Sequence, residues 1–562
     1  MKRNIHSKNE LADCLGIKLA TLTYILYKIP NNEKYYLFNI PKKTGGVREI
    51  SSPVASLKHI QTIIAKQLSE TYEEIFQNYS ASSSLSHGFR KNHSIVTNSK
   101  KHKNKRYVFN IDLEKFFPSI NFGRVRGYFI KSNYFNYTPE VATIISQICC
   151  FGNALPQGSP ASPVLSNLIA NMLDIRLVRL AKKYKCTYSR YADDITFSTN
   201  QKTFPKEIAE LSSEGKWKSG LDLSRDINNC GFIINENKTS MQYRTARQVV
   251  TGLTVNKIVN INRSYYKTTR AYCSQLFQFG EYYIKKEIIC IDSEERVIKT
   301  KGTEKQLEGR LSYIYSIRKQ YYKDYNSNKH YPIGIVKQYK LFLIHKYFIG
   351  NKIPTIIVEG KTDTIYLKCA LQNLLDKYPE LVTNSDGIIK YNISFLNYTN
   401  TIKEIFGISS GTSGQIDLIK VVLKYKDHYL YSINKKPAIF IFDNDKGSKL
   451  VKNMLKNDFG FSEIDCSRYY NIHDNLYIIF STITDNTEIE DLFESIILES
   501  KVGNKVFNRS ILMDNNNEYS KIVFAEKVIK PKWKKIDFTK FERIFNIIKD
   551  IINRNITIAS TG

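Results

Sequence analysis

The chain has 562 residues, 42% of them hydrophobic and 12% aromatic, and its formal net charge is +30. This composition excludes a wholly disordered chain, and at roughly 100–200 residues per domain the length predicts three to four compact units. The sequence has no apolar run long enough to span a membrane, and its first residues lack the apolar segment of a secretory signal. We therefore expect a cytoplasmic protein without a membrane segment.

The charge is concentrated in the first part of the chain. Residues 1–350 hold 54 Lys and Arg against 27 Asp and Glu, whereas residues 351–562 hold 29 against 26. Such an asymmetry is typical of a nucleic-acid-binding part joined to something else. AT-rich coding would also enrich the chain in Lys, but it does not explain why the excess lies in one part. We expect residues 1–350 to bind a polyanion.

Hydrophobic periodicity predicts a mixed α and β organisation before residue 350. The stretch at 78–105 is polar, basic and Ser-rich, and 283–306 is expected to be a polar insertion. The predicted elements are a helix at 9–28 capped by Asn9, a strand–turn–strand at 35–51, helices at 54–77 and 160–183, a buried strand ending at Asp112, a hairpin at 188–199, and helices at 307–348. From residue 353 onward, apolar strands alternate with helical stretches, which predicts a parallel α/β domain.

Three acidic residues form the first candidate site. Asp112 follows an apolar strand, and Asp193 and Asp194 lie at the tip of the predicted hairpin. Carboxylates that converge repel one another unless cations lie between them, and oxygen ligands favour Mg²⁺. Two such ions, about 3.5–4 Å apart, can activate a hydroxyl and stabilise a leaving pyrophosphate. An Asp-Asp pair is most often a solvated turn, but strand-forming residues on both sides favour a functional pair.

The sequence YADD, with NIDLEKFFPSI and LPQGSPASPVLSNL before it, resembles the polymerase core of reverse transcriptases. The resemblance implies an α+β right-hand polymerase, with fingers and palm in 1–240 and a thumb and linker helices in 241–350. It implies that Asp112, Asp193 and Asp194 hold two Mg²⁺ ions and that the substrates are deoxynucleoside triphosphates.

The same resemblance implies a nucleotide-binding set. Phe117 matches the aromatic residue that excludes the 2′-hydroxyl of a ribonucleotide, although a core aromatic is the alternative. Cations on the predicted finger hairpin would clamp the triphosphate, Arg48 above all, whereas Lys42 and Lys43 could equally be solvated. The other matching residues are Gln157 and Gly158, which line the nucleotide pocket, and Lys238, which would protonate the leaving pyrophosphate.

Two further blocks resemble the retron class of reverse transcriptases, which make a branched, RNA-linked DNA. NSKKH at 98–102 is similar to the block N-A-x-x-H, with Ser99 in place of Ala, and VTGLTVN at 250–256 is similar to the block that begins V-T-G. The resemblance implies an RNA-facing loop and RNA binding by Asn98, Lys101, His102, Thr251 and Gly252. It implies the chain's own noncoding RNA and its DNA copy as partners. The open alternatives are an abortive-infection or intron-type enzyme without a branched product; no HNH endonuclease motif follows.

The second candidate site lies after residue 350. Glu359 follows one apolar strand, and Asp443 and Asp445 follow another. Sites in parallel sheets form at the carboxyl ends of the strands, so we expect these acids to meet at one edge and to need a divalent cation. The sequence SSGTSG at 409–414 predicts a flexible loop at that edge.

This pattern resembles the TOPRIM fold, which implies an α/β domain with a parallel sheet over 351–562. It implies a metal-dependent nuclease with one or two divalent ions, a nucleic acid target, and Glu490 and Asp491 as further candidate ligands. The alternatives are a charge pair at a helix start for those two acids and a non-catalytic docking module for the domain. The whole chain resembles bacterial retrons that fuse a reverse transcriptase to TOPRIM in anti-phage defence. Self-association of the chain is left open.

Overall fold

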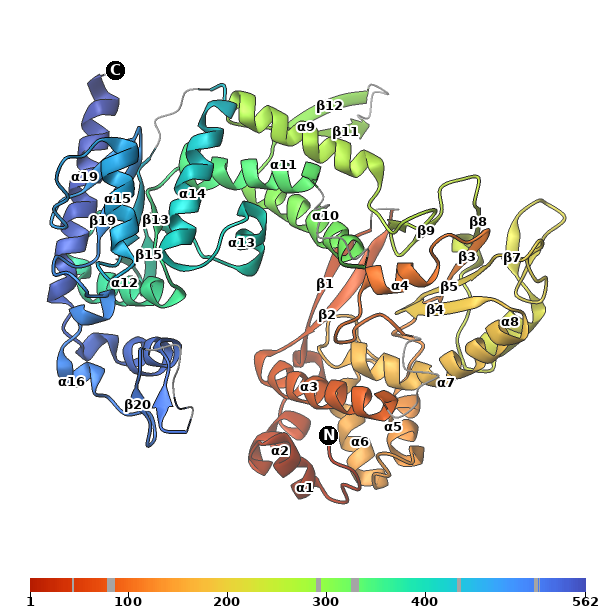
Figure 1. The fold of residues 1–562 in the computed structure, drawn as a ribbon. Helices are drawn as coiled ribbons and strands as arrows, with labels where there is room; N and C mark the ends of the chain where they lie inside the picture. Colours follow the sequence, from red (N-terminus) through yellow and green to blue (C-terminus); the bar gives the residue numbers. More distant parts are fainter. Residues whose placement is uncertain are drawn as a thin grey trace. The chain divides into compact units, whose positions relative to one another are not determined.

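The computed structural model describes residues 1–42, 45–77, 86–289, 295–324, 333–431, 436–509, 514 and 516–561 (Figure 1). The chain divides into two compact units. The first is essentially Met1–Arg263, and the second comprises Ser264–Tyr322 and Asn326–Gly562. The predicted thumb helices therefore group with the C-terminal residues. The three-part division at 240 and 350 stays a prediction. None of the described helices combines the length and apolar character that crossing a bilayer requires.

A four-stranded antiparallel sheet forms the centre of the first unit. Its order is β4 (Thr187–Tyr191), β5 (Asp194–Thr199), β3 (Tyr107–Asp112) and β8 (Ser240–Tyr243). The long helices α3 (Ala55–Gln77) and α7 (Ser162–Lys183) pack against each other, and α7 also contacts β4. The predicted buried strand that ends at Asp112 and the hairpin around Asp193 are confirmed.

The N-terminal region differs from its prediction. Instead of one helix over 9–28, the chain forms α1 (Lys8–Leu15) and α2 (Leu19–Tyr27), and Ser7 rather than Asn9 caps the first. Gly16 ends α1 in the left-handed region, at φ 64°, which a residue with a side chain rarely adopts. The strand–turn–strand prediction is confirmed by β1 (Tyr35–Pro41) and β2 (Val47–Pro53), although the turn residues 43–44 lie outside the described residues.

The polar and basic stretch at 78–105 contains a helix, α4 (Ile95–Lys101), which Ser94 caps. Residues 78–85 lie outside the described part of the chain. The remaining elements of the unit are α5 (Phe122–Lys131), α6 (Pro139–Cys149), β6 (Ala209–Leu211), β7 (Trp217–Ser219), α8 (Leu221–Asn228), β9 (Val249–Val250) and β10 (Leu253–Thr254).

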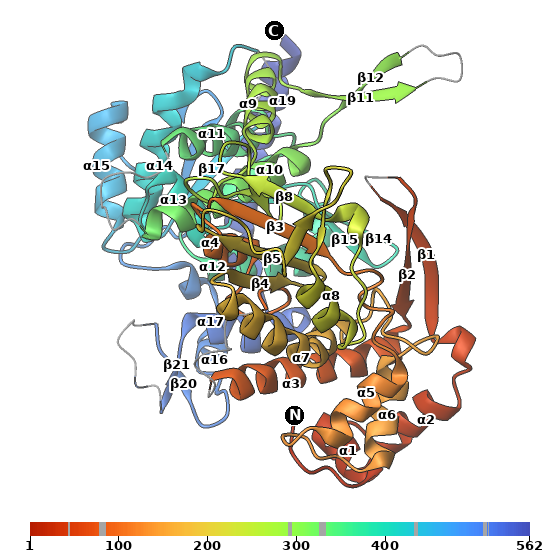
Figure 2. The ribbon, with the colours of Figure 1, turned by 90° about the vertical axis from the view of Figure 1, so that its right-hand side faces the viewer.

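The second unit begins with helices that precede its main sheet. They are α9 (Arg263–Phe279, whose first residue belongs to the first unit), α10 (Glu304–Asp324) and α11 (Ile333–Ile344). The predicted polar insertion at 283–306 is instead largely an antiparallel hairpin, β11 (Tyr283–Ile289) and β12 (Glu295–Lys301), which extends from the end of α9 in Figure 2.

A five-stranded sheet forms the core of this unit, in the order β16 (Ser394–Phe395), β13 (Thr355–Ile357), β17 (Ala438–Phe442), β19 (Leu476–Phe480) and β18 (Tyr470–His473). The first four strands are parallel and β18 is antiparallel. All residues of β17 and β19 are buried, as expected for strands covered on both faces. Helices α12 (Lys361–Asn373), α14 (Gly411–Tyr425), α15 (Ser448–Phe459) and α19 (Glu542–Thr561) surround the sheet.

Short elements complete the second unit. They are β14 (Val382–Ser385), β15 (Ile388–Tyr391), α13 (Asn400–Phe406), α16 (Ser495–Leu498), β20 (Val506–Phe507), β21 (Glu518–Tyr519), α17 (Lys521–Val523) and α18 (Lys530–Lys532).

Candidate functional site

The three acidic residues of the first unit come together at one end of its sheet. Asp112, the last residue of β3, is the cross-strand partner of Asp194, the first residue of β5. Asp193 lies in the short turn that joins β4 to β5. Lys238 donates a hydrogen bond from Nζ to Asp112 Oδ1 at 3.0 Å. The backbone thus brings the predicted acids together, and one of them faces a cation of the chain itself.

The acids repel one another electrostatically. Burial raises the pKa of Asp193, and the charge of Asp112 raises it further. Burial and the charges of Asp193 and Asp112 raise the pKa of Asp194 to about 7. Adding positive charge here would favour the ionised forms, so the donor chemistry fits a divalent cation. Within the described residues, however, no group of three or more His, Cys, Asp or Glu side chains is close enough to hold a metal ion.

A buried ion pair supports the acidic turn between β4 and β5. Arg190 donates from Nε and Nη2 to the two carboxylate oxygens of Asp174, each at 2.7 Å, and from Nη1 to the carbonyl of Ala192 at 3.1 Å. Ala192 has a φ of 56°, a strained value for a residue with a Cβ. A Cβ on Gly88 would lie 2.8 Å from the Ala192 nitrogen. Sequence reasoning missed these supports, although the Arg directly before YADD was visible.

The burial of Phe117 does not match a fully buried core residue or a fully exposed one. Its side chain is half-buried, and its ring centroid lies 5.5 Å from that of Phe116 and 6.3 Å from that of Phe89. Phe89, which is exposed, also lies 6.5 Å from Tyr191 of the YADD sequence. Phe89 thus lies between Phe117 and the YADD sequence. Its role in selecting the sugar stays a prediction.

The predicted pocket residues lie against the finger hairpin. The Ser51 amide of β2 donates to the Gln157 carbonyl at 2.8 Å. Gly158 has a φ of 126°, and a Cβ there would lie 2.7 Å from the Ser51 carbonyl oxygen, so only Gly fits this approach. Arg48, on the same strand, is exposed, and its charge acts to lower the pKa of Asp193. Lys42 is exposed, and Lys43 lies outside the described residues.

The expectation of an RNA-facing loop is wrong for the side chains of Asn98 and His102, both of which are buried. The His102 ring lies between two hydroxyls, with Nδ1 2.7 Å from Ser198 Oγ and Nε2 2.7 Å from Ser189 Oγ. Ser189 in turn donates to Asn98 Oδ1 at 2.6 Å. Burial lowers the pKa of His102 to about 3, so the ring is neutral. These residues fix α4 to strands β4 and β5.

The two retron-like blocks contact each other. Ser99 Oγ donates to the Val250 carbonyl at 2.8 Å, and Thr251 Oγ1 donates to the Ile95 carbonyl at 3.2 Å. Lys101 is half-buried, which lowers its pKa, whereas Gly252 is exposed. Exposed cations flank the joined blocks: Arg106, Arg244, Arg247 and Lys257. Of the predicted RNA-binding residues, Lys101, Thr251 and Gly252 thus keep some access to solvent.

The acids of the second unit lie at one edge of its sheet. Glu359 follows β13 closely and Asp443 follows β17 directly, and these strands are parallel neighbours. The Asp443 amide donates to Glu359 Oε1 at 3.3 Å, and Ser481, directly after β19, donates to Asp443 Oδ1 at 2.6 Å. Asp445 accepts from the Gly447 amide at 2.8 Å. The predicted meeting of strand ends is therefore observed.

Burial dominates the electrostatics of this edge. It raises the pKa of Glu359 to about 7, with smaller contributions from the charges of Asp445 and Asp363. It raises the pKa of Asp443 well above its ordinary value, and Asp363, Glu359 and Glu490 add to this effect. Asp363 also accepts a hydrogen bond from the Gly360 amide at 2.8 Å, at the start of α12. The buried carboxylates are chemically suited to a divalent cation.

The structure bears on two further predictions at this edge: Glu490 and Asp491 as ligands, and the loop at 409–414. Glu490 is fully buried and accepts from Lys521 at 3.2 Å, while Asp491 pairs with Arg509 at 2.8 Å, so both already have cationic partners. The flexible loop predicted at 409–414 is wrong, because residues 411–414 form the first turn of α14. Thr412, in that turn, donates to Glu359 Oε1 at 3.1 Å.

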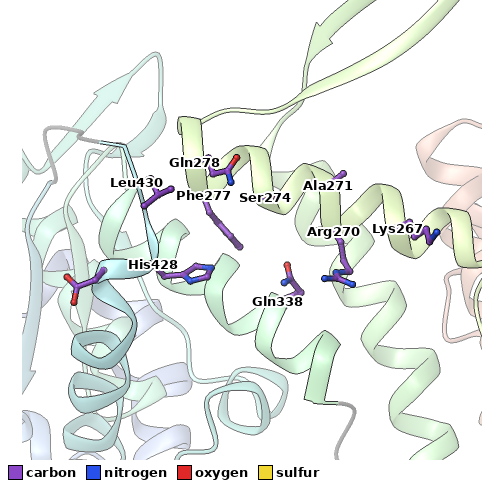
Figure 3. A pocket seen from close by; sticks show the side chains of 10 residues that line it. Lys267, Arg270, Ala271, Ser274, Phe277, Gln278, Gln338, His428 and Leu430 are labelled. Atoms are coloured by element: carbon purple, nitrogen blue, oxygen red, sulfur yellow. The ribbon is translucent and has the colours of Figure 1, made fainter.

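A polar stripe on α9 borders a cavity of about 650 Å³ in the second unit. The stripe consists of Lys267, Arg270, Ser274 and Gln278, which helical spacing places on one face. Figure 3 shows Gln338 of α11 and His428 across the cavity from this face. Asp427 also lines it. The surface offers cations and hydrogen-bond donors suited to phosphate oxygens.

Comparison with known proteins links the first unit, which carries Asp112, Asp193 and Asp194, to a family. The family described as "Reverse transcriptase (RNA-dependent DNA polymerase)" matches residues 40–255. The Retron Ec86 reverse transcriptase of Escherichia coli is 31% identical over 277 residues, which cover 49% of this chain and 78% of that protein. The Retron Mx65 reverse transcriptase of Myxococcus xanthus is 32% identical over 288 residues, 48% of this chain and 62% of that protein's length.

Solved structures are more distant. The telomerase of Candida albicans, solved with a fragment of telomeric RNA, has a TM-score of 0.31 and 9% sequence identity to this chain. That similarity covers 57% of this chain and 62% of the telomerase chain and is too low to support an argument.

Proposed function

Because the chain belongs to the family of retron reverse transcriptases, we propose that it copies an RNA template into DNA at the site of Asp112, Asp193 and Asp194. The observation that carries this proposal is the register pair of Asp112 and Asp194, with Asp193 in the adjoining turn. The substrates are deoxynucleoside triphosphates. Two Mg²⁺ ions held by these carboxylates would supply the charge stabilisation that phosphoryl transfer requires.

The chain's own residues bind and orient the reactants. Phe117 borders the sugar of the incoming nucleotide, and Gln157 and Gly158 line its pocket beside β2. The Arg48 guanidinium is suited to triphosphate oxygens, because it is planar and permanently charged. Lys238, 3.0 Å from Asp112, holds a proton beside the acids that can pass to the leaving pyrophosphate.

The template and product would be the retron's own noncoding RNA and the branched RNA-linked DNA copied from it. We assign RNA contact to Lys101, Thr251, Gly252 and the exposed cations that flank the joined blocks. The α9 stripe is a second surface for phosphate contacts. An abortive-infection or intron-type enzyme without a branched product is the alternative. Sequencing the nucleic acid that copurifies with the protein decides between them, because only a retron product carries a branch that joins RNA to DNA.

For the second unit we propose a TOPRIM-type nuclease that acts as the effector of an anti-phage system. The carboxyl-end edge that joins Glu359, Asp443 and Asp445 supports this proposal. One or two divalent ions there would activate a water for phosphodiester cleavage. The alternative, a non-catalytic docking module, would need no such acids. Incubating the protein with labelled RNA and DNA and Mg²⁺, with Glu359→Gln beside wild type, tests the proposal; equal cleavage by both would refute it.

A further inference from the structure

A second cavity of the C-terminal unit, of about 500 Å³, runs along one face of α12. Its lining includes three lysines, Lys361, Lys368 and Lys530, and three aromatic residues, Tyr391, Tyr398 and Trp533. None of the described residues that line it is acidic. This contrasts with residues 351–562 as a whole, where 29 Lys and Arg nearly balance 26 Asp and Glu. The cavity thus combines positive charge with aromatic surface.

The cavity reaches the edge of the sheet that carries the acids. Tyr398 lies shortly after β16, which is the parallel neighbour of β13, and Glu359 lies shortly after β13. The carboxyl ends of both strands therefore lie at the same edge. Lys361, which begins α12, is two residues beyond Glu359. The charge of Glu359 also contributes to the raised pKa of Tyr398, after burial, which indicates that the two side chains are close.

The lining contains a polar group that lacks a partner. Tyr398 is 8% exposed, and its hydroxyl makes no hydrogen bond of ordinary geometry among the described residues, although the Gln415 side chain lies near enough to lower its pKa. Buried polar groups are nearly always paired, so this one is available to a ligand. The Lys368 ammonium lies 5.6 Å from the centroid of the Tyr391 ring. Lys530 pairs with Glu526 on the exposed surface at 2.8 Å and can exchange that partner for a phosphate.

We propose that this cavity binds one nucleotide of a nucleic acid strand and presents the neighbouring phosphodiester to the edge of Glu359 and Asp443. The lysines would contact phosphate oxygens, and the Tyr391 and Trp533 rings would stack on the base. This combination is the one that proteins use to hold single strands without sequence preference. The inference rests on the proposed nuclease function, for which it supplies a substrate class: a strand with an unpaired base.

Trp533 gives a direct measurement of binding. The chain has two Trp residues, so Trp217→Phe leaves Trp533 as its only indole. The full-length chain with this change is titrated with a 5′-phosphorylated single-stranded hexanucleotide, of RNA and of DNA, without divalent ions so that no cleavage occurs. We expect the strand to quench the Trp533 fluorescence in a saturable way. A free nucleoside monophosphate should quench it only at much higher concentration; equal affinity for the monophosphate would overturn the assignment to a strand.

Charge reversal tests the lysines. In the Trp217→Phe background, Lys368→Glu with Lys530→Glu should weaken the apparent affinity at least tenfold, whereas the control Lys532→Glu, an exposed neighbour outside the lining, should leave it unchanged. Unchanged quenching in the double variant would overturn the proposal. Lys368→Gln, which keeps most of the side-chain stem, serves if the double variant does not fold. It should also weaken binding, and unchanged affinity there would count against the site.

Cleavage separates this inference from the function on which it rests. If wild type cuts no strand but quenching still depends on Lys368 and Lys530, the nuclease proposal fails and the nucleotide site stands. If wild type cuts a strand and Trp533 does not respond to any strand, the cavity proposal fails alone.

Discussion

Arg190 and Asp174 form a buried ion pair with two parallel hydrogen bonds, and the exposed fractions of their side chains are 0% and 1%. The pair lies directly behind the turn that carries Asp193. Asp174 also accepts from the Tyr188 hydroxyl at 2.6 Å, so both of its oxygens are in use. The geometry of the acidic turn therefore depends on a salt bridge that is buried away from solvent.

Asp174→Ala should destabilise the first unit, because it leaves the Arg190 guanidinium buried without its partner. Removing one member of a buried pair typically costs about 3–5 kcal/mol in the free energy of unfolding. We expect the melting temperature and DNA synthesis to fall together. The matched control is Glu214→Ala, whose pair with Lys216 is exposed. Equal effects from the two changes would contradict a positioning role for Arg190.

Asp193→Asn combined with Asp194→Asn should abolish primer extension, because these side chains are the proposed metal ligands. Binding of the RNA should persist, because it depends on cations elsewhere in the chain. Primer extension and an RNA gel shift, run on the same preparation, check both parts. Normal extension by the double variant would remove the YADD acids from the mechanism.

Phe117→Val should let the polymerase incorporate ribonucleotides, because the smaller side chain leaves room for a 2′-hydroxyl. We expect the ratio of kcat/KM for ribonucleotides over deoxynucleotides to rise roughly tenfold or more. Phe116→Leu, a buried neighbour, is the control and should leave this ratio unchanged. If Phe117→Val folds normally and its selectivity does not change, the residue belongs to the core only.

The pKa of Asp194 predicts how pH affects stability. In the unfolded chain this carboxyl titrates near its ordinary value, whereas its native pKa is about 7. Between about pH 4 and pH 7 the native state binds more protons than the unfolded state, so this group makes stability fall as pH rises through that window.

Mg²⁺ should reverse this trend, because it binds the ionised carboxylates. We expect the rise in melting temperature on adding Mg²⁺ to grow as pH increases through about 7. Asp194→Asn should make this Mg²⁺ effect depend less on pH. Glu359 also has a pKa of about 7, so Glu359→Gln is included to remove the contribution of the second unit. A Mg²⁺ effect independent of pH in wild type would argue against these carboxyls as ligands.

In cells, degrading the DNA product tests the hypothesis that the bound product restrains the proposed nuclease. Induced degradation of the product should then stop growth of cells with wild type but not with Glu359→Ala. Growth curves and the integrity of cellular nucleic acid provide the readout. Equal toxicity in the two strains would place the damage outside this site.

The sequence predicts the acidic end of the first unit's sheet well because its signals are local. The alternation typical of strands is enough to predict the apolar strand that ends at Asp112. It is also enough to place Asp193 and Asp194 between two strands. By contrast, His102 reads as part of a polar loop, and its burial depends on Ser189 and Ser198, which are nearly a hundred residues away in the chain.

The prediction at 409–414 failed for a related reason. Its Gly and Ser residues are typical of loops, whereas the structure starts α14 there. Thr412 then donates to Glu359, a contact between positions 53 residues apart. Local composition carries no information about such a contact, nor about the cations that pair with Glu490 and Asp491.

The contacts of Ser99 with Val250 and of Thr251 with Ile95 bear on the engineering of retrons. Segments 94–106 and 244–260 are packed as one body, although about 140 residues separate them in the sequence. Transplanting only one of them between retrons would leave mismatched hydrogen bonds in a buried seam. A chimera meant to accept another retron's RNA should therefore exchange both segments together.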